Sequence, residues 1–415
     1  MSTSLEELTR ERIDARNFPT TPVSVEEVRG AGHALDDLWL PTVVARESTI
    51  AHNLTRFASW CRERDVDHAP HGKTSMAPQL WQRQLEHGAW GLTAATVAQA
   101  RTMYAFGVER IIIANEVVDP SQAQWLARVA LEPERTCLVL VDSEAGARVL
   151  EQAAQEAGTR IPVLVEIGVP GRRTGARTVA EALELARLVH ASTGLELTGV
   201  EGYEGVLPQG RDEGAVEAVT VWLTQLGELA RSADAEGLFD GEEIIVTAGG
   251  SAFPDLASDA LHAVGDLSRP VRRIIRSGCV ITHDHQSYER SSPLRSGATS
   301  DPLVPALTAY ARVHSAPEPG RALATIGKRD VAVDVDLPVL LRVRRPGGPW
   351  EQLDGLTVLE LNDHHLFIDD PQSSLQVGDV VELGLSHPCT TFDKWDLIPL
   401  VDDEDHVIDA LVTLF

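Results

Sequence analysis

Residues 136–169, TCLVLVDSEAGARVLEQAAQEAGTRIPVLVEIGV, contain the pattern from which the fold can be predicted. Two short apolar runs flank a longer segment with helical spacing, and Asp142 and Ser143 at its start are both common helix N-cap residues. Gly158 follows the helical segment and suits a helix C-terminus. A strand–helix–strand order of this kind is typical of α/β proteins.

The same pattern repeats on both sides of this stretch. We expect eight strands, at 66–72, 90–96, 110–117, 136–143, 162–169, 197–205, 243–251 and 272–281. Helical segments lie between them, among others at 76–88, 96–107, 142–158 and 178–194. The number of units and their length predict an α/β fold of the (β/α)8 TIM-barrel type. A doubly wound open sheet is the alternative.

The pattern changes after about residue 300. Segments such as DVAVDVDLPVLLRVRR (330–345) are short or alternating β runs separated by Gly, Pro and Asp turns. We therefore expect an N-terminal helical extension (1–34), a barrel (35–300) and a C-terminal all-β domain (301–415). LWLPTVVARESTI (38–50) reads as a further strand leading into a helix, which fits either domain.

Composition narrows the range of partners. The chain has 415 residues, 43% of them hydrophobic and 24% charged, which is typical of a globular protein. Its net charge of −26 argues against nucleic acid or an anionic membrane as a partner. The four cysteines form no CxxC pair or disulfide framework, and no signal peptide or membrane-spanning run is visible. We therefore expect a cytoplasmic protein with reduced thiols.

Lys73 stands in HAPHGKTSMAP (68–78), directly after the first predicted barrel strand. Catalytic groups of barrel enzymes lie where strands run into the following loops. A lysine that forms a Schiff base must lose its proton, which desolvation and nearby positive charge favour. A solvent-facing loop lysine is the alternative, and placement alone leaves both interpretations open.

The last two predicted strands end in glycine-bearing stretches, Gly249-Gly250-Ser251 and Gly278-Cys279. Such stretches let backbone N–H groups approach a phosphate, although two tight turns would have the same sequence. Arg173 and Tyr203 also follow predicted strands, where they would meet a cofactor ring or pack within a loop. A strand-end lysine, a phosphate cradle and a ring-facing group together are what pyridoxal phosphate requires.

The stretch SHPCTTFDKW (386–395) in the β domain contains His387 and Cys389, two residues apart. An imidazole and a thiolate at this spacing suit a zinc ion with open positions for substrate. A turn with a buried cysteine and an exposed histidine is the alternative. THDH (282–285) and NDHH (362–365) are interpreted as structural or solvated.

PHGKT, GRRTG, GYEG, TAGGS, RSGC and SHPCTTFDKW, in this order, resemble motifs of the fold-type III pyridoxal-phosphate enzymes, and most closely of the D-serine dehydratase and D-threonine aldolase family. The resemblance spans residues 35–415 and implies an alanine-racemase-like barrel, a D-amino acid substrate and a homodimer. It implies that Lys73 binds the cofactor covalently and removes the Cα proton, and that His387 and Cys389 bind a catalytic divalent metal. It further implies cofactor contacts from Arg173, Tyr203, Gly249, Gly250, Ser251, Gly278 and Cys279.

The chain departs from the family pattern at Arg172, where Asn is common, and at Glu204, where His is common. The resemblance associates a His-x-Cys metal motif with dehydratases and His-x-Asp with many aldolases, so Cys389 favours elimination to a 2-oxo acid and ammonia. The thiolate favours zinc, with manganese or magnesium as alternatives. An aldolase, a non-catalytic carrier of pyridoxal phosphate and a racemase are the other readings. The racemase would need a tyrosine from the β domain, near which only Tyr310 lies in the sequence.

Overall fold

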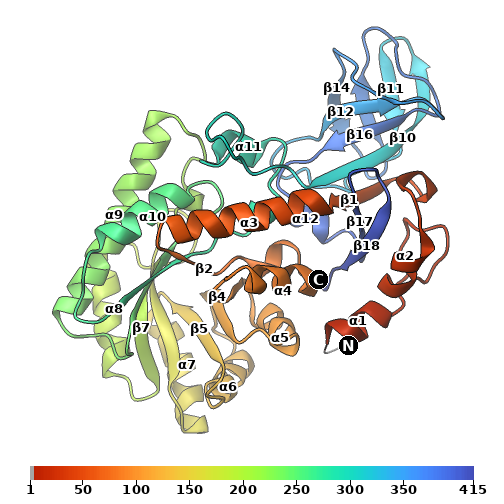
Figure 1. Cartoon of the computed structure of the whole chain (residues 1–415). Helices are drawn as coiled ribbons and strands as arrows, with labels where there is room; N and C mark the ends of the chain where they lie inside the picture. The colour runs from red at the N-terminus through yellow and green to blue at the C-terminus, as the bar shows by residue number, and fades with distance from the viewer. Residues whose placement is uncertain (1–3) are drawn as a thin grey trace.

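The computed structural model describes residues 4–415. Figure 1 shows an α/β barrel, coloured orange to green, beside a β-rich part in blue. The long helix α3 (Glu47–Glu63) runs between them. The functional cavity described below lies where the two parts meet.

The barrel is built from eight parallel strands, which confirms the predicted fold class. They are β2 (Asp67–His68), β3 (Leu92–Ala94), β4 (Arg110–Glu116), β5 (Thr136–Val141), β6 (Ile161–Ile167), β7 (Leu195–Gly202), β8 (Ile244–Ala248) and β9 (Val271–Ile275). Their order in the sheet is β2-β9-β8-β7-β6-β5-β4-β3. A single bridge between His71 and Thr93 joins the two edges, so the barrel is nearly closed.

Helices follow the strands around the outside. They are α4 (Pro78–Glu86), α5 (Val97–Ala105), α6 (Pro120–Val129), α7 (Glu144–Ala157), α8 (Val179–Ala191), α9 (Glu213–Ala235), α10 (Pro254–Ala263) and α11 (Ser287–Ser291). Short 3-10 turns, η2 (Gly72–Thr74), η3 (Glu204–Val206) and η4 (Cys279–Ile281), lie after β2, β7 and β9.

The stretch 136–169 folds as β5, α7 and β6, as expected. Ser143 is the N-cap of α7, because its side chain accepts a hydrogen bond from the Gly146 N–H. Gly158 ends the helix with φ of +70°, a backbone conformation that glycine adopts without strain. Asp142, the other N-cap candidate, instead accepts a hydrogen bond from Gly175 N–H and lines the cavity.

The barrel interior is apolar along the strands and polar near their carboxyl ends. Leu138, Leu140, Leu164, Ile245 and Ile274 form a buried cluster inside the strands. Inward-pointing residues nearer the carboxyl ends of the strands are polar, as Glu201 and Arg276 illustrate. Apolar side chains therefore lie beneath the cavity, and charged side chains line its wall.

The second sheet is mostly antiparallel and has the order β13-β12-β16-β10-β1-β17-β18, with β11, β14 and β15 extending from β10. Its strands are β1 (Thr42–Arg46), β10 (Leu307–Glu318), β11 (Arg321–Ala324), β12 (Val339–Arg344), β13 (Trp350–Glu351), β14 (Thr357–Leu361), β15 (Leu366–Asp369), β16 (Val380–Gly384), β17 (Leu397–Val401) and β18 (Val407–Val412). A single turn of helix, α12 (Cys389–Phe392), interrupts it.

The strand at residues 42–46 belongs to this second sheet, because β1 pairs with β10 and β17. Residues 42–46, which lie inside the predicted range 35–300, thus pair with strands of the second sheet, and α3 follows them toward the barrel. The sequence could not decide this, because the partners of β1 lie more than 260 residues away along the chain, as in the pair Thr42 and Tyr310.

The N-terminal helices α1 (Leu5–Arg10) and α2 (Val25–Ala31) and the turn η1 (Leu35–Asp37) cover this sheet near β18. Leu8, Val25 and Val28 are buried in one cluster with Val407 and Val412. The extension is thus held to the sheet by apolar packing.

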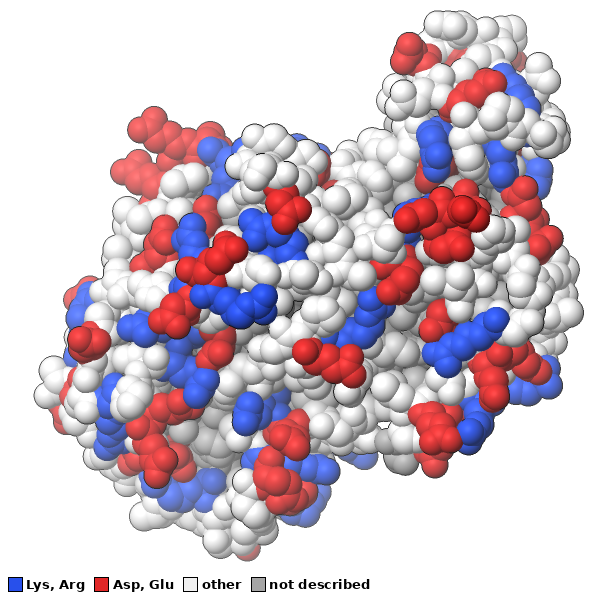
Figure 2. Space-filling model, in the orientation of Figure 1, with Lys and Arg blue, Asp and Glu red and all other residues white. Residues whose placement is uncertain are grey.

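Within residues 4–415, no helix is both long and apolar enough to cross a membrane. On the face drawn in Figure 2, acidic and basic side chains alternate without a broad basic area.

Candidate active site

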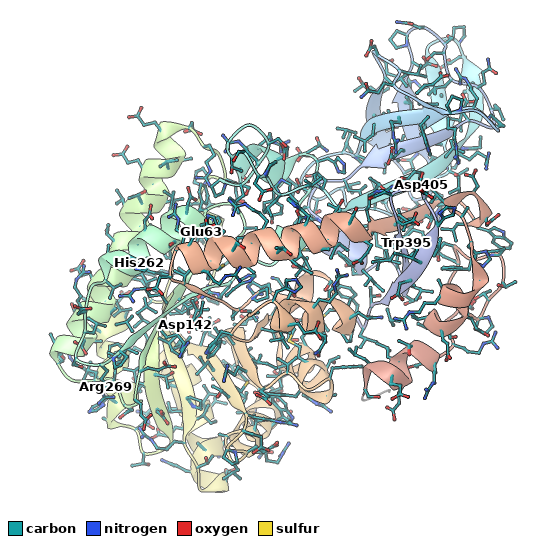
Figure 3. All side chains as sticks on the ribbon, viewed as in Figure 1. Glu63, Asp142, His262, Arg269, Trp395 and Asp405 are labelled. Atoms are coloured by element: carbon teal, nitrogen blue, oxygen red, sulfur yellow. The ribbon has the colours of Figure 1, made fainter. Side chains whose placement is uncertain are left out.

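A cavity of about 990 Å³ lies between the carboxyl ends of the barrel strands and the loop that carries His387. Asp142, labelled in Figure 3, lines the cavity on the barrel side. The cavity brings together nearly all residues proposed from the sequence: Lys73, Arg173, Tyr203, Gly250, Ser251, Gly278, Cys279, His387 and Cys389 all line it. Gly249 is adjacent but does not line the wall.

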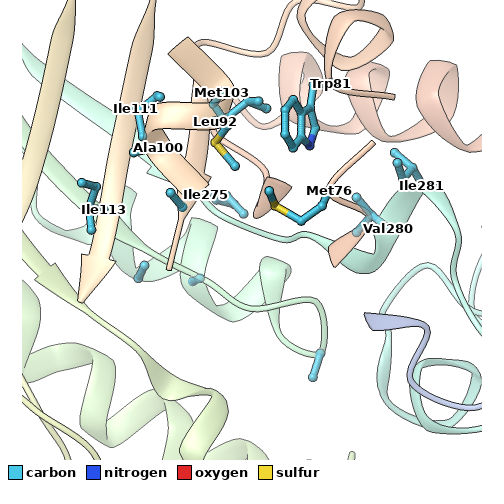
Figure 4. Packing of buried hydrophobic residues seen from close by; sticks show 14 of the residues in the cluster. Met76, Trp81, Leu92, Ala100, Met103, Ile111, Ile113, Ile275, Val280 and Ile281 are labelled. Atoms are coloured by element: carbon cyan, nitrogen blue, oxygen red, sulfur yellow. The ribbon is translucent and has the colours of Figure 1, made fainter. Parts of the chain in front are cut away.

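Lys73 sits in η2, directly after β2. The turn is held in place because Trp81 Nε1 donates to the Gly72 carbonyl at 3.0 Å. A Cβ on Gly72 would lie 2.5 Å from Met103 Cε, so the backbone is packed closely against the core. Figure 4 shows Met76, Trp81 and Met103 clustered at this position. The chain has three lysines, Lys73, Lys328 and Lys394, and only Lys73 lines the cavity.

The loop after β8 is bonded in a way that the sequence did not indicate. Glu204, fully buried, accepts hydrogen bonds from Gly250 N–H at 2.6 Å and from Gly249 N–H at 3.1 Å. Burial raises the pKa of Glu204. These two N–H groups already donate to Glu204, so they are not free to bind a phosphate. Fewer residues are therefore available for phosphate binding than the sequence predicted.

Of the residues predicted for the phosphate cradle, Ser251 and Gly278 keep backbone N–H groups that are free to bind a phosphate. Ser251 Oγ accepts a hydrogen bond from Cys279 N–H at 3.1 Å, which ties the two loops together. Within residues 4–415, the N–H groups of Ser251 and Gly278 have no acceptor. A Cβ on Gly278 would lie 2.7 Å from both His71 Cβ and Thr74 Oγ1, so only glycine fits there.

Arg173 and Tyr203 lie against each other, with Arg173 Cζ 5.4 Å from the centre of the Tyr203 ring. Burial raises the pKa of Tyr203 to about 12, so the phenol is protonated at neutral pH. Arg172, the departure noted in the sequence, does not line the cavity, whereas Arg177 does.

His387 and Cys389 enter the cavity from the β-rich part. His387 Nδ1 lies 2.6 Å from Asp334 Oδ2, and its backbone N–H donates to Asp284 Oδ2 at 2.8 Å. Cys389 Sγ lies 3.5 Å from Cys279 Sγ and 3.5 Å from Thr74 Oγ1. Hydrogen bonds from Cys279 and His387 hold the pKa of Cys389 well below its usual range. The hydrogen bond to Cys389 raises the pKa of His387 to about 9.

Several cavity residues were missed by sequence reasoning. Arg276 is 1% exposed, donates to Thr247 Oγ1 at 2.9 Å and forms an ion pair with Glu201. Glu166 and Glu201 are neighbours across β6 and β7. Burial raises the pKa of Glu166 to about 10 and that of Glu201 to about 7. Strand alternation is the signal that would have placed these side chains inside the barrel.

Glu116, Asp142 and Glu166 bring their carboxylate oxygens within 4.8 Å of one another. Three carboxylates this close repel one another when all are ionised, and a proton on one of them relieves that repulsion. The raised pKa of Glu166 corresponds to such a proton.

Tyr310, the tyrosine considered for a racemase, is fully buried and donates to Glu382 Oε1 at 2.8 Å. It lies outside the cavity wall. Tyr203 and Tyr288 are the tyrosines that line the cavity.

With this geometry established, the chain can be compared with known proteins. Residues 46–269 match the family described as "Alanine racemase, N-terminal domain", which is more than half of the chain. The chain belongs to this family. Residues 306–401 also match the family described as "Putative serine dehydratase domain". The alanine racemase N-terminal domain family comprises fold-type III pyridoxal-phosphate enzymes, as the motifs indicated.

Individual relatives are more distant. The chain is 26% identical to the D-threonine aldolase of Arthrobacter sp over 88% of this chain and 89% of that protein. It is 28% identical to the D-threo-3-hydroxyaspartate dehydratase of Delftia sp. (strain HT23) over 40% of this chain and 43% of that protein. The crystal structure of D-threonine aldolase from Filomicrobium marinum has a TM-score of 0.76 at 24% identity, covering 92% of this chain and 96% of that one.

The residues present fit pyridoxal phosphate. The cavity is at the upper end of the size range for small-molecule sites, about 300–1,000 Å³. The cavity wall carries positive charge that suits a phosphate, from Lys73, Arg173, Arg177 and Arg276. The free N–H groups of Ser251 and Gly278 belong to the loops predicted to hold that phosphate. His71 Nδ1 and Arg276 Nε are buried and have no partner within residues 4–415. A polar ligand would satisfy such groups.

The residues also fit a divalent metal. Asp334 orients the His387 ring through Nδ1 and leaves Nε2 for a metal, the usual arrangement of a carboxylate behind a histidine ligand. The thiolate form of Cys389 is the form that binds metal.

Proposed function

We propose that this protein is a pyridoxal-phosphate- and metal-dependent lyase that acts on D-3-hydroxy amino acids, with dehydration to a 2-oxo acid and ammonia as its reaction. One observation supports this proposal above the others. Lys73 from the barrel and His387 and Cys389 from the β-rich part line the same cavity, so a Schiff-base lysine and a metal-binding pair face one substrate.

When bound at Lys73, pyridoxal phosphate supplies an electron sink that acidifies the Cα–H of an amino acid. A metal at His387 and Cys389 supplies a Lewis acid for the β-hydroxyl. The amine of Lys73 would accept the Cα proton at Nζ. Ser251 and Gly278 orient the phosphate, while Arg173 and Tyr203 bound the space beside the ring.

Cys389 favours dehydration over aldol cleavage. The resemblance associates a cysteine at this position with dehydratases. In dehydration, a hydroxyl held by a metal would leave without losing its own proton to a base. Aldol cleavage is the second candidate, because a relative that matches over 88% of this chain is named a D-threonine aldolase. That reaction needs the hydroxyl proton to be removed.

Product analysis with D-threonine separates the two reactions. We expect 2-oxobutanoate and ammonia from the cofactor- and metal-loaded protein. Glycine and acetaldehyde instead would make the protein an aldolase. Bound cofactor without turnover of any D-3-hydroxy amino acid would favour a carrier of the cofactor over an enzyme.

The role of Lys73 can be tested by Lys73→Ala. We expect loss of the visible absorbance of bound cofactor and a fall in turnover of at least about 10³-fold, since nucleophile and base are removed together. Lys328→Ala is the matched control, because Lys328 is exposed and lies outside the cavity wall. Unchanged absorbance in Lys73→Ala would contradict the assignment.

A further inference from the structure

Two cysteines from different parts of the chain meet at the cavity wall. Cys279 begins η4 after the last barrel strand, and Cys389 begins α12 in the β-rich part. Their Sγ atoms are 3.5 Å apart, and Cys279 is only 4% exposed. Both residues line the cavity. From the sequence, Cys279 was assigned only to the phosphate side of the site.

The separation of the two sulfur atoms suits a shared metal ion. Zinc–sulfur bonds are about 2.3 Å long, so two thiolates at a tetrahedral angle on one zinc are about 3.8 Å apart. A disulfide would require the sulfur atoms to approach to about 2.05 Å. The observed 3.5 Å is close to the first value, so a small side-chain adjustment would accommodate an ion.

The histidine ligand is adjacent to the same pair. His387 lines the same cavity two residues before Cys389, and Asp334 accepts a hydrogen bond from its Nδ1 at 2.6 Å. Cys389 Sγ therefore contacts the Cys279 thiol on the wall of the cavity that the His387 ring also lines. The ring nitrogens of His387 do not lie within 4.8 Å of both sulfur atoms, so a shared ion would require the ring to turn toward the pair.

We propose that Cys279 is a third protein ligand of the catalytic metal, giving a Cys2His set with one position open for substrate. This inference rests on the proposed function, because it concerns the metal that the function requires. Both cysteines bind as thiolates, and their protons are released when the metal is loaded. Two thiolates select zinc over magnesium or manganese, which prefer oxygen ligands. They also neutralise the charge of the ion, so the open position suits a neutral hydroxyl.

The arrangement couples the metal to the cofactor loop. The backbone N–H of Cys279 donates to Ser251 Oγ, and its side chain points toward Cys389. One residue would then position both the phosphate side and the metal side of the site.

X-ray absorption spectroscopy of the zinc-loaded wild-type protein tests the proposal without any substitution. We expect two sulfur neighbours at about 2.3 Å from zinc. A single sulfur neighbour would overturn the proposal while leaving the proposed function intact. Binding of manganese or magnesium in place of zinc would overturn this proposal alone, whereas failure to bind any divalent metal would overturn both.

Cobalt(II) binding to reduced, metal-free protein provides the second measurement. We expect Cys279→Ser to lose about half of the thiolate-to-cobalt charge-transfer absorbance and to bind cobalt on the order of 10-fold more weakly or worse. Cys137→Ala is the control, because Cys137 is buried in β5 and does not line the cavity. Retained cofactor absorbance in Cys279→Ser would verify folding. Wild-type cobalt absorbance and affinity in that variant would contradict the proposal.

Discussion

At the scale of single residues, His387 has an unusual backbone. Its φ is +53°, in the left-handed region that few residues other than glycine adopt. The conformation is held by hydrogen bonds on two sides, from the backbone N–H to Asp284 and from Nδ1 to Asp334. A strained residue over-determined by its neighbours is common at functional sites, where it aims a side chain.

Asp334→Ala tests whether this orientation matters for metal binding. Removing the carboxylate leaves the His387 ring free to rotate and to change tautomer, so we expect metal affinity to fall about 10–100-fold. Asp336→Ala is the matched control, because Asp336 accepts from Ser386 Oγ and pairs with Arg290 but does not contact His387. Competition against a chelator measures the affinity. Equal effects of the two substitutions would contradict a specific role for Asp334.

At the scale of elements, one buried carboxylate connects the barrel to the loop that carries His387. Asp284 is 3% exposed and follows η4 in the THDH stretch, which the sequence indicated to be structural. Oδ1 accepts from Gln286 N–H at 3.0 Å and Tyr288 N–H at 2.8 Å, and Oδ2 accepts from His387 N–H at 2.8 Å. It therefore fixes the start of α11 and the His387 loop together.

Asp284→Ala should loosen both elements at once. Buried N–H groups left without an acceptor cost about 1–3 kcal/mol each, so we expect a clear loss in the free energy of unfolding and weaker metal binding. Urea unfolding and chelator competition measure the two effects. Asp354→Ala, at an exposed position, is the control. Full stability in Asp284→Ala would show that these N–H groups find other partners.

At the scale of the whole molecule, the carboxyls inside the barrel make stability depend on pH. The pKa of Glu166 rises from 4.5 to about 10 on folding, chiefly by burial. Between these values the folded chain holds a proton that the unfolded chain releases. The contribution is therefore fully present below pH 4.5 and is lost as pH rises toward 10.

We expect the free energy of unfolding to fall between pH 6 and pH 9. The fall is up to about 1.4 kcal/mol per pH unit for each proton that the folded chain holds and the unfolded chain releases. Glu166→Gln carries no such proton and should show a flatter profile, whereas Glu217→Gln, exposed on α9, should follow the wild type. Urea unfolding at matched cofactor content measures this. Parallel profiles for the wild type and Glu166→Gln would contradict the assignment.

Much of the fold was determined by local sequence pattern. All eight barrel strands lie where apolar runs predicted them, because burial on both faces makes such strands near-continuously apolar. The predicted runs extend past the strands, since residues such as Tyr203 and Ser251 belong to the loops that carry the site. Lys73 and the His387–Cys389 pair were visible because their residue types and spacing are unusual.

The tertiary structure alone decided which distant groups meet. The membership of β1 in the second sheet, the Glu204 carboxylate on the Gly249-Gly250 loop and the contact between Cys279 and Cys389 join segments 45 to more than 260 residues apart. The charged layer of Glu166, Glu201 and Arg276 likewise arises only when the sheet curls and turns these side chains inward. The sequence pattern of one helix or strand reflects which of its faces is buried. The contacts between distant residues depend instead on how the strands close into a barrel and where the second sheet packs against it.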